Sequence, residues 1–141
     1  MMKDTFSLDP RLAADTVHVC DWGLCGVHLM NDVRYPWLVL VPRRAGLIEP
    51  FDLPADDQVL LWREAMHAGA LLKGLSGCAK VNVGALGNVV SQLHVHVVGR
   101  KAGDFAWPGP VWGQGAPVRF EATALGAEVA RWRGALRPPT D

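Results

Sequence analysis

The chain has 141 residues, half of them apolar, and its 14 basic and 14 acidic side chains balance to a formal net charge of zero. This length suits one domain with a proper core, and the composition excludes a disordered polymer. The charge balance argues against a basic nucleic-acid surface and against a polybasic membrane surface. No run of about 18 apolar residues occurs, so no membrane-spanning helix is predicted.

The N-terminal six residues lack the apolar core of a signal peptide, so we expect a cytoplasmic protein. Its three cysteines, Cys20, Cys25 and Cys78, are then expected to be reduced and partly buried. The spacing Cys20-x4-Cys25-x2-His28 is similar to a zinc loop. Cys25 and His28 have opposite strand parity, however, and would face opposite sides of a sheet. We therefore predict no metal site.

Five strands are expected from alternating or continuous apolar patterns. They cover residues 16–20, 24–30, 37–42, 80–84 and 89–98. A lead-in, irregular or briefly helical, precedes them, and the third strand is predicted to stop at a proline.

The longest helix is predicted from about Pro54 to Leu75, with acidic residues in its first turn, where they suit the helix dipole, and with Gly77 at its end. Residues 99–115 are rich in Gly, Pro and Trp and are expected to form an ordered loop. Residues 122–136 are predicted to form the final helix. Together these elements indicate the α+β class.

Gln92, His94 and His96 alternate with apolar residues. A strand has a period of two, so these three side chains are predicted to share one face of the last strand. Two imidazoles and an amide in a row could attack, protonate or bind an anion such as a phosphate. Two histidines at this spacing are also a common surface feature, and both interpretations stay open on spacing alone. A metal protein is a third and weaker interpretation, because the row supplies two ligands, fewer than zinc needs, and any further ligand would have to come from elsewhere in the fold.

This row resembles the motif of the histidine triad (HIT) superfamily, His-φ-His-φ-His-φ-φ, in which φ is apolar and Gln92 here replaces the first histidine. The resemblance extends to an amide ahead of the third strand, to amides around a Gly-rich turn, and to the run that follows the row in the fragile-histidine branch. These positions are Asn31, Asn82, Asn88 and the run Arg-Lys-Ala-Gly-Asp-Phe at 100–105.

The resemblance implies a five-stranded antiparallel sheet with one long helix and a C-terminal helix. We therefore expect residues 1–141 to form a single HIT-like domain: a lead-in over 1–15, a core over 16–106, and a Trp/Pro loop and C-terminal helix over 107–141. A homodimer is also implied, in which sheet extension gives an open edge a partner. No cofactor, metal, nucleic acid or membrane is expected as a partner.

The activity implied by the resemblance is hydrolysis or transfer at the α-phosphate of a nucleotide or nucleotide conjugate. His94, in the middle of the row, would be the nucleophile and form a nucleotidyl-histidine. His96 would hydrogen-bond the phosphate or protonate the leaving group. Asn31 would bind ribose hydroxyls, and Asn82 and Asn88 would bind phosphate oxygens. The alternative is a nucleotide-binding module with little or no turnover.

Two departures from the family's pattern concern the groups behind the nucleophile. Gln92 replaces one histidine, and Pro36-Trp37 stands where the family carries another. We expect the amide and the indole to have replaced an imidazole pair as a unit, with Gln92 as a non-titrating member of the catalytic set. The tryptophans at 107 and 112 have two interpretations, an aromatic wall beside the site or a loop anchored on the core.

Overall fold

A sheet of five antiparallel strands is the centre of the structure, a computed structural model that describes residues 5–140. In chain order the elements are α1 (Pro10–Asp15), β1 (Thr16–Asp21), β2 (Cys25–Met30), β3 (Trp37–Pro42), η1 (Pro50–Asp52), α2 (Ala55–Ser76), β4 (Lys80–Gly84), β5 (Val95–Arg100) and α3 (Ala122–Ala135). The strand order is β1-β2-β3-β5-β4. The predicted α+β architecture is therefore confirmed. Residues 1–4, which carry part of the lead-in and signal-peptide predictions, lie outside the described residues.

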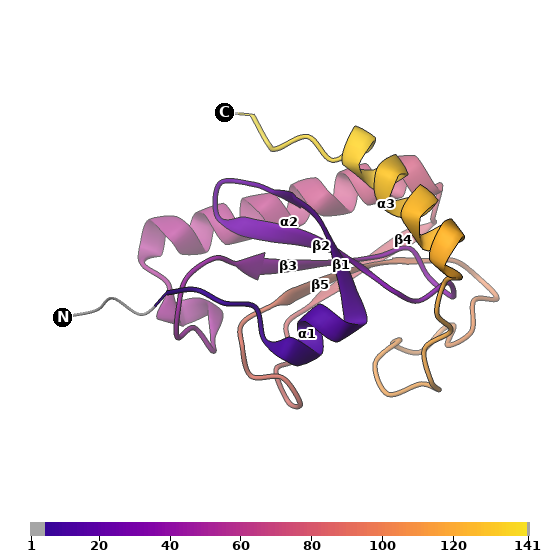
Figure 1. The fold of residues 1–141 in the computed structure, drawn as a ribbon, viewed down its shortest axis with the longest axis horizontal. Coiled ribbons are helices and arrows are strands. Elements are labelled where there is room, and N and C mark those ends of the chain that lie inside the picture. Colours follow the sequence, from indigo (N-terminus) through magenta and orange to yellow (C-terminus); the bar gives the residue numbers. More distant parts are fainter. Residues whose placement is uncertain (1–4, 141) are drawn as a thin grey trace.

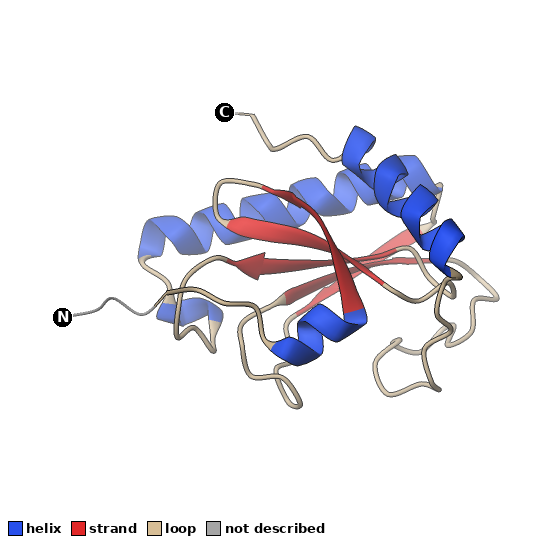
Figure 2. Cartoon of the chain, in the orientation of Figure 1, coloured by secondary structure: helices blue, strands red, loops and turns tan. Residues whose placement is uncertain are grey.

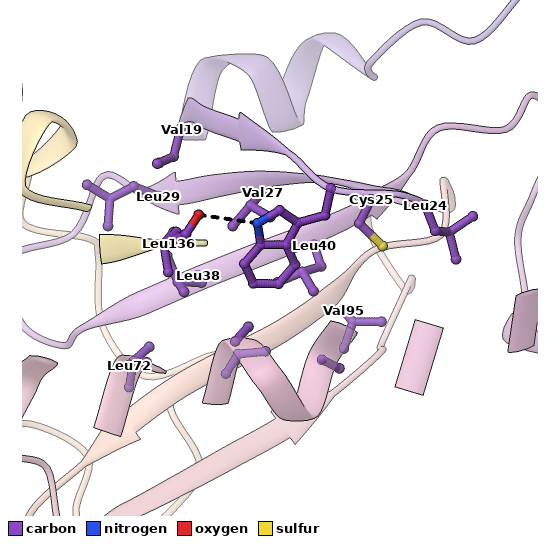
Figure 3. Close-up of a cluster of buried hydrophobic side chains, with 14 of the residues drawn as sticks. Val19, Leu24, Cys25, Val27, Leu29, Leu38, Leu40, Leu72, Val95 and Leu136 are labelled. Atoms are coloured by element: carbon purple, nitrogen blue, oxygen red, sulfur yellow. Dashed lines mark hydrogen bonds between the residues drawn. The ribbon is translucent and has the colours of Figure 1, made fainter. Parts of the chain in front are cut away.

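The long helix α2 covers one face of the sheet, as Figures 1 and 2 show. Alternate strand residues such as Val27 and Leu38 point to this face and pack with Leu72 of α2. The chain after α3 closes the same core, where the carbonyl of Leu136 accepts a hydrogen bond from Nε1 of Trp22 at 3.3 Å (Figure 3). Within residues 5–140, no helix combines the length and apolar character needed to cross a bilayer.

The opposite face of the sheet carries a second apolar cluster. Its buried members include Leu12 of α1, Trp37 and Val39 of β3, Val98 of β5, and Val111 of the loop after β5. Because side chains alternate along a strand, every second residue of β5 points to this face. The short helix α1 and the loop after β5 therefore enclose a space over the face that α2 leaves free.

Most predicted boundaries agree with the structure. β3 and β4 have the predicted bounds, and α2 ends at Gly77, which adopts the left-handed conformation with φ 70°. Glycine reaches that conformation without a steric penalty, which explains why the helix ends there.

The last strand, however, is shorter than predicted. β5 begins at Val95, so Gln92 and His94 lie in an irregular segment before it and only His96 is on the strand. The expectation that all three share one strand is wrong. Pairing with β3 ends at Val95 and pairing with β4 ends at His96, so residues 92–94 have no neighbouring strand to pair with.

The side chain of Gln92 fastens the N-terminal segment to the segment before β5. Its Nε2 donates to the Ser7 carbonyl, and its Oε1 accepts from the main-chain N–H of Asp9, each at 2.8 Å. The guanidinium of Arg11 adds a bond to the Val89 carbonyl at 2.9 Å. Both polar ends of the Gln92 amide are thus bonded to main chain.

Cys25 and His28 lie on opposite faces of β2, as their spacing predicted. Cys25 is in the core beneath α2, whereas His28 packs against His18 with ring centroids 5.3 Å apart. The two side chains therefore cannot share a metal ion. The three cysteines are free thiols, of which Cys20 is half-buried and the others buried.

Acid is expected to destabilise this fold through His28. Burial, and next the charge of His18, lowers the pKa of His28 from 6.5 to about 4. Between these values the unfolded chain binds the proton and the folded chain does not, so stability present at pH 7 is lost as the pH falls toward 4. We expect His28 to lower the free energy of unfolding by about 1–2 kcal/mol when the pH falls from 7 to 5. Urea unfolding of the protein and of His28→Gln at both pH values measures the difference, and an equal loss in the variant would contradict it.

Candidate functional site

A cavity of about 540 Å³ opens on the face of the sheet opposite α2. Trp37 of β3 and His96 of β5 line it, together with residues of α1, of the turn after β4 and of the loop after β5. Its apolar lining residues include Leu12, Met30, Leu86, Val89, Val90 and Val111. A cavity of this size with apolar walls and a few polar groups suits a small-molecule ligand.

The two ring nitrogens of His94 have different roles. Nδ1 lies 2.7 Å from the main-chain oxygen of Gln92. A carbonyl oxygen only accepts hydrogen bonds, so Nδ1 carries the ring proton. In the neutral ring Nε2 then has a lone pair, and no group within residues 5–140 is bonded to it. The side chain is buried but lines the cavity, so this lone pair is available to a bound ligand.

His96 has the opposite arrangement. Nε1 of Trp37 lies 3.0 Å from Nδ1 of His96. An indole N–H only donates, so Nδ1 is the acceptor and the proton of the neutral ring is on Nε2. The sheet brings the two side chains together, because Val39 pairs with His96 and Trp37 lies two residues away on the same face.

His96 is neutral at physiological pH. Burial, and next the charge of His94, lowers the pKa of His96 to about 3. The rings of the two histidines meet edge-on with centroids 4.9 Å apart. The pair therefore presents a lone pair and an N–H next to each other, which is the combination needed by a nucleophile and a donor to a phosphate oxygen.

The two tryptophans of the loop after β5 have different surroundings. Trp112 lines the cavity, and its ring centroid lies 5.5 Å from that of His96. Trp107 is exposed, with the Arg100 guanidinium over its ring at 5.7 Å. The aromatic-wall interpretation thus describes Trp112, whereas Trp107 belongs neither to that wall nor to the core.

The three amides expected to bind substrate are not all at the cavity. Asn88 lines it. Asn31 and Asn82 do not, and their side-chain oxygens are bonded within the protein. Oδ1 of Asn31 accepts the main-chain N–H of Phe120, and Oδ1 of Asn82 accepts from the Arg100 guanidinium, both at 2.9 Å.

Two ion pairs at the cavity were missed by the sequence analysis. Asp32 pairs with Arg34 at 2.9 Å, and Asp15 pairs with Arg119 at 2.7 Å, and all four residues line the cavity. Asp32 directly follows Asn31 in the sequence, so considering the residue next to the predicted ribose-binding position would have indicated it. Nothing local in the sequence links Asp15 to Arg119, because they come from opposite ends of the chain.

The side chains of Gln92 and Trp37 bond different partners. The amide of Gln92 bonds the N-terminal segment, and the indole of Trp37 bonds His96. Gln92 contacts the nucleophile candidate, His94, through its main-chain oxygen. The two side chains are separated because β5 begins after Gln92 and the side chain of this residue turns to the lead-in, and the joint replacement of an imidazole pair stays a prediction.

A HIT domain model matches residues 11–103 of the chain. A histidine triad protein from Sinorhizobium meliloti 1021 is 47% identical, with a TM-score of 0.89 over 94% of this chain and 98% of that one. A histidine triad protein from Marinobacter aquaeolei VT8 is 43% identical, with a TM-score of 0.91 over 94% and 97% of the two chains. No curated protein matches the sequence.

A more distant likeness shows the fold alone. The C. elegans NitFhit structure is 16% identical, with a TM-score of 0.65 over 87% of this chain and 28% of that one. The family model covers most of the chain, and the bacterial structures match it nearly end to end in sequence and in fold. The chain therefore belongs to the HIT domain family, a superfamily of nucleotide-binding hydrolases and transferases.

Proposed function

We propose that the protein is a nucleotidyl hydrolase or transferase that acts at the α-phosphate of a nucleotide or nucleotide conjugate. The observation that carries this proposal is the histidine pair, in which the free Nε2 lone pair of His94 lies next to the N–H of His96 at one cavity. Membership of the HIT family supports a nucleotide-related function.

His94 is the proposed nucleophile. Its Nε2 lone pair attacks the α-phosphorus in line, an N–P bond forms, and the bond from phosphorus to the leaving group breaks with its electron pair going to the leaving group. The ring becomes cationic, which strengthens the bond from Nδ1–H to the Gln92 carbonyl. Water or another acceptor then attacks phosphorus, the N–P electron pair returns to Nε2, and the acceptor's proton passes to solvent. Positioning and charge stabilisation supply most of the rate gain in such transfers.

The remaining predicted residues have supporting roles in this proposal. His96 donates its Nε2–H to a phosphate oxygen, and Asn88 holds phosphate from the turn after β4. The apolar lining accommodates the base. Asn31 and Asn82 act indirectly. Asn31 positions the main chain at residue 120, and Asn82 positions the buried side chain of Arg100.

A nucleotide-binding module with little or no turnover is the second candidate. It is favoured by the amides of Asn31, Asn82 and Gln92, which are bonded within the protein and leave fewer groups for the transition state. Such a module would bind the same ligand without forming a bond to His94.

A covalent adduct on His94 is the direct test. The protein is mixed with adenosine 5′-(4-nitrophenyl phosphate), quenched within milliseconds and analysed by intact mass. We expect a gain of one AMP group together with nitrophenolate release. His94→Asn should show neither, because it lacks the nucleophilic nitrogen, and should lose at least about 10³-fold in rate.

The matched control is His18→Asn, which removes an exposed histidine on β1 outside the cavity. It should form the adduct as the unmodified protein does. Tight binding of AMP without adduct or product in the unmodified protein would reject the enzyme and leave the binding module.

Gln92→Ala should loosen the N-terminal segment more than it slows the chemistry. It removes both bonds to residues 7 and 9 but keeps the main-chain oxygen that holds His94. We expect a loss of about 1–3 kcal/mol in unfolding free energy and faster amide exchange over residues 7–11. Gln114→Ala, at an exposed glutamine, is the control. A loss of kcat as large as in His94→Asn, with exchange unchanged, would instead give the Gln92 side chain a direct catalytic role.

We also propose a homodimer joined through β4. The sheet has two edge strands, β1 and β4. On β1, the Arg133 guanidinium donates to the carbonyls of His18 and Val19 at 3.1 Å and so covers part of that edge. β4 is half-exposed and pairs on one side only, and an open edge favours a further strand. Light scattering is expected to give twice the mass of one chain, and the mass of a single chain would contradict the dimer.

A further inference from the structure

The indole of Trp37 limits what His96 can do. To become an imidazolium, His96 would need a proton on Nδ1, the atom that accepts the Trp37 N–H at 3.0 Å. Two N–H groups would then face each other with no acceptor between them. His96 as a whole residue is 7% exposed, so water cannot readily compensate for the lost bond.

The charged groups around His96 do not favour the imidazolium. The titratable side chain in contact with the ring is His94, which becomes cationic during the proposed attack and would repel a second positive charge. The carboxylates that line the same cavity, Asp15 and Asp32, are each paired with an arginine. Neither offers an uncompensated negative charge that would stabilise a protonated ring.

We propose that Trp37 is a positioning residue that holds His96 as a neutral hydrogen-bond donor, and that the site therefore selects nucleotide conjugates whose leaving group departs as a stable anion. This inference rests on the proposed function of His94. It names the substrate class of that same site: acyl and phosphoryl conjugates of a nucleoside monophosphate, with phosphoramidates of alkylamines disfavoured.

The chemistry of the first step explains this selection. When the bond from phosphorus to the leaving atom breaks, the electron pair stays on the leaving atom. A carboxylate or a phosphate needs no proton at that moment, since their conjugate acids have pKa values of about 4 and about 6. The nitrogen of an alkylamine must be protonated as the bond breaks, because without that proton it would depart as the anion RNH⁻, a far stronger base than a carboxylate or a phosphate. A neutral imidazole N–H stabilises charge but does not give up its proton for this purpose.

The state of the His96 ring can be measured without any substrate. Nitrogen-15 NMR of the histidine side chains at pH 7 should show Nδ1 of His96 unprotonated and Nε2 protonated. Trp37→Phe keeps a ring on the strand but removes the donor, so this tautomer preference should be lost. Trp112→Phe is the matched control, because that indole also contacts His96 but donates no hydrogen bond to it.

The leaving-group preference is measured with two AMP derivatives, the 4-nitrophenyl ester and the butylphosphoramidate. The unmodified protein should have a kcat/KM about 10²–10⁴-fold higher for the ester than for the amidate. This factor is the usual rate gain from a general acid, which the amidate needs and which His96 does not supply. Trp37→His introduces a ring that can accept as well as donate and that titrates near neutrality. We expect this variant to reduce the preference at least about tenfold, through faster turnover of the amidate.

The outcomes are distinguishable. A protonated Nδ1 on His96, or equal kcat/KM for ester and amidate in the unmodified protein, would overturn the inference. Turnover of neither compound would overturn the proposed function and the leaving-group selection together. In that case the nitrogen spectra still decide whether Trp37 sets the His96 tautomer, so the two failures have different signatures.

Discussion

The pairing of β3 with β5 is the constraint on which the site depends. Its register sets Val39 opposite His96 and so brings the indole of Trp37 within hydrogen-bond distance of a histidine that is distant in sequence. The same pairing sends alternate residues into the core beneath α2, so the register cannot slip by one residue without moving the apolar side chains to the wrong face. Core packing and ring orientation are therefore fixed by one set of main-chain hydrogen bonds.

The two histidines differ because their partners differ. A carbonyl, which only accepts, determines the proton position on His94, and an indole N–H, which only donates, determines it on His96. Neither partner titrates near neutral pH. The opposite proton positions of the two rings thus arise without any charged residue of the described range 5–140 bonded to either ring, and the ion pairs of the cavity are left to shape its walls.

The sequence predicted much of the fold because its signals are local. A proline stop, a glycine helix end and apolar alternation give β3, β4 and α2 nearly as observed. The predicted start of β5 is wrong because the length of a strand depends on where its neighbouring strands end. The residues around Gln92 carry no information about where β3 and β4 end. For the same reason the sequence indicated His94 and His96 but neither the bond from Trp37 nor the pairing of Asp15 with Arg119, which bring distant segments together.

The side chain of Gln92 holds the N-terminal segment through main-chain atoms of residues 7 and 9, and the side chains of these two residues take no part in the two bonds. Any residue at position 7 supplies the same carbonyl, and any residue except proline at position 9 supplies the same N–H. Ser7 is thus open to evolutionary drift, or to replacement by a residue that carries a spectroscopic label, without loss of this connection. A spectroscopic label at position 7 would lie on the N-terminal segment, which is bonded to Gln92, two residues before the proposed nucleophile. The label would therefore respond to ligand binding near the cavity without changing any residue that lines it.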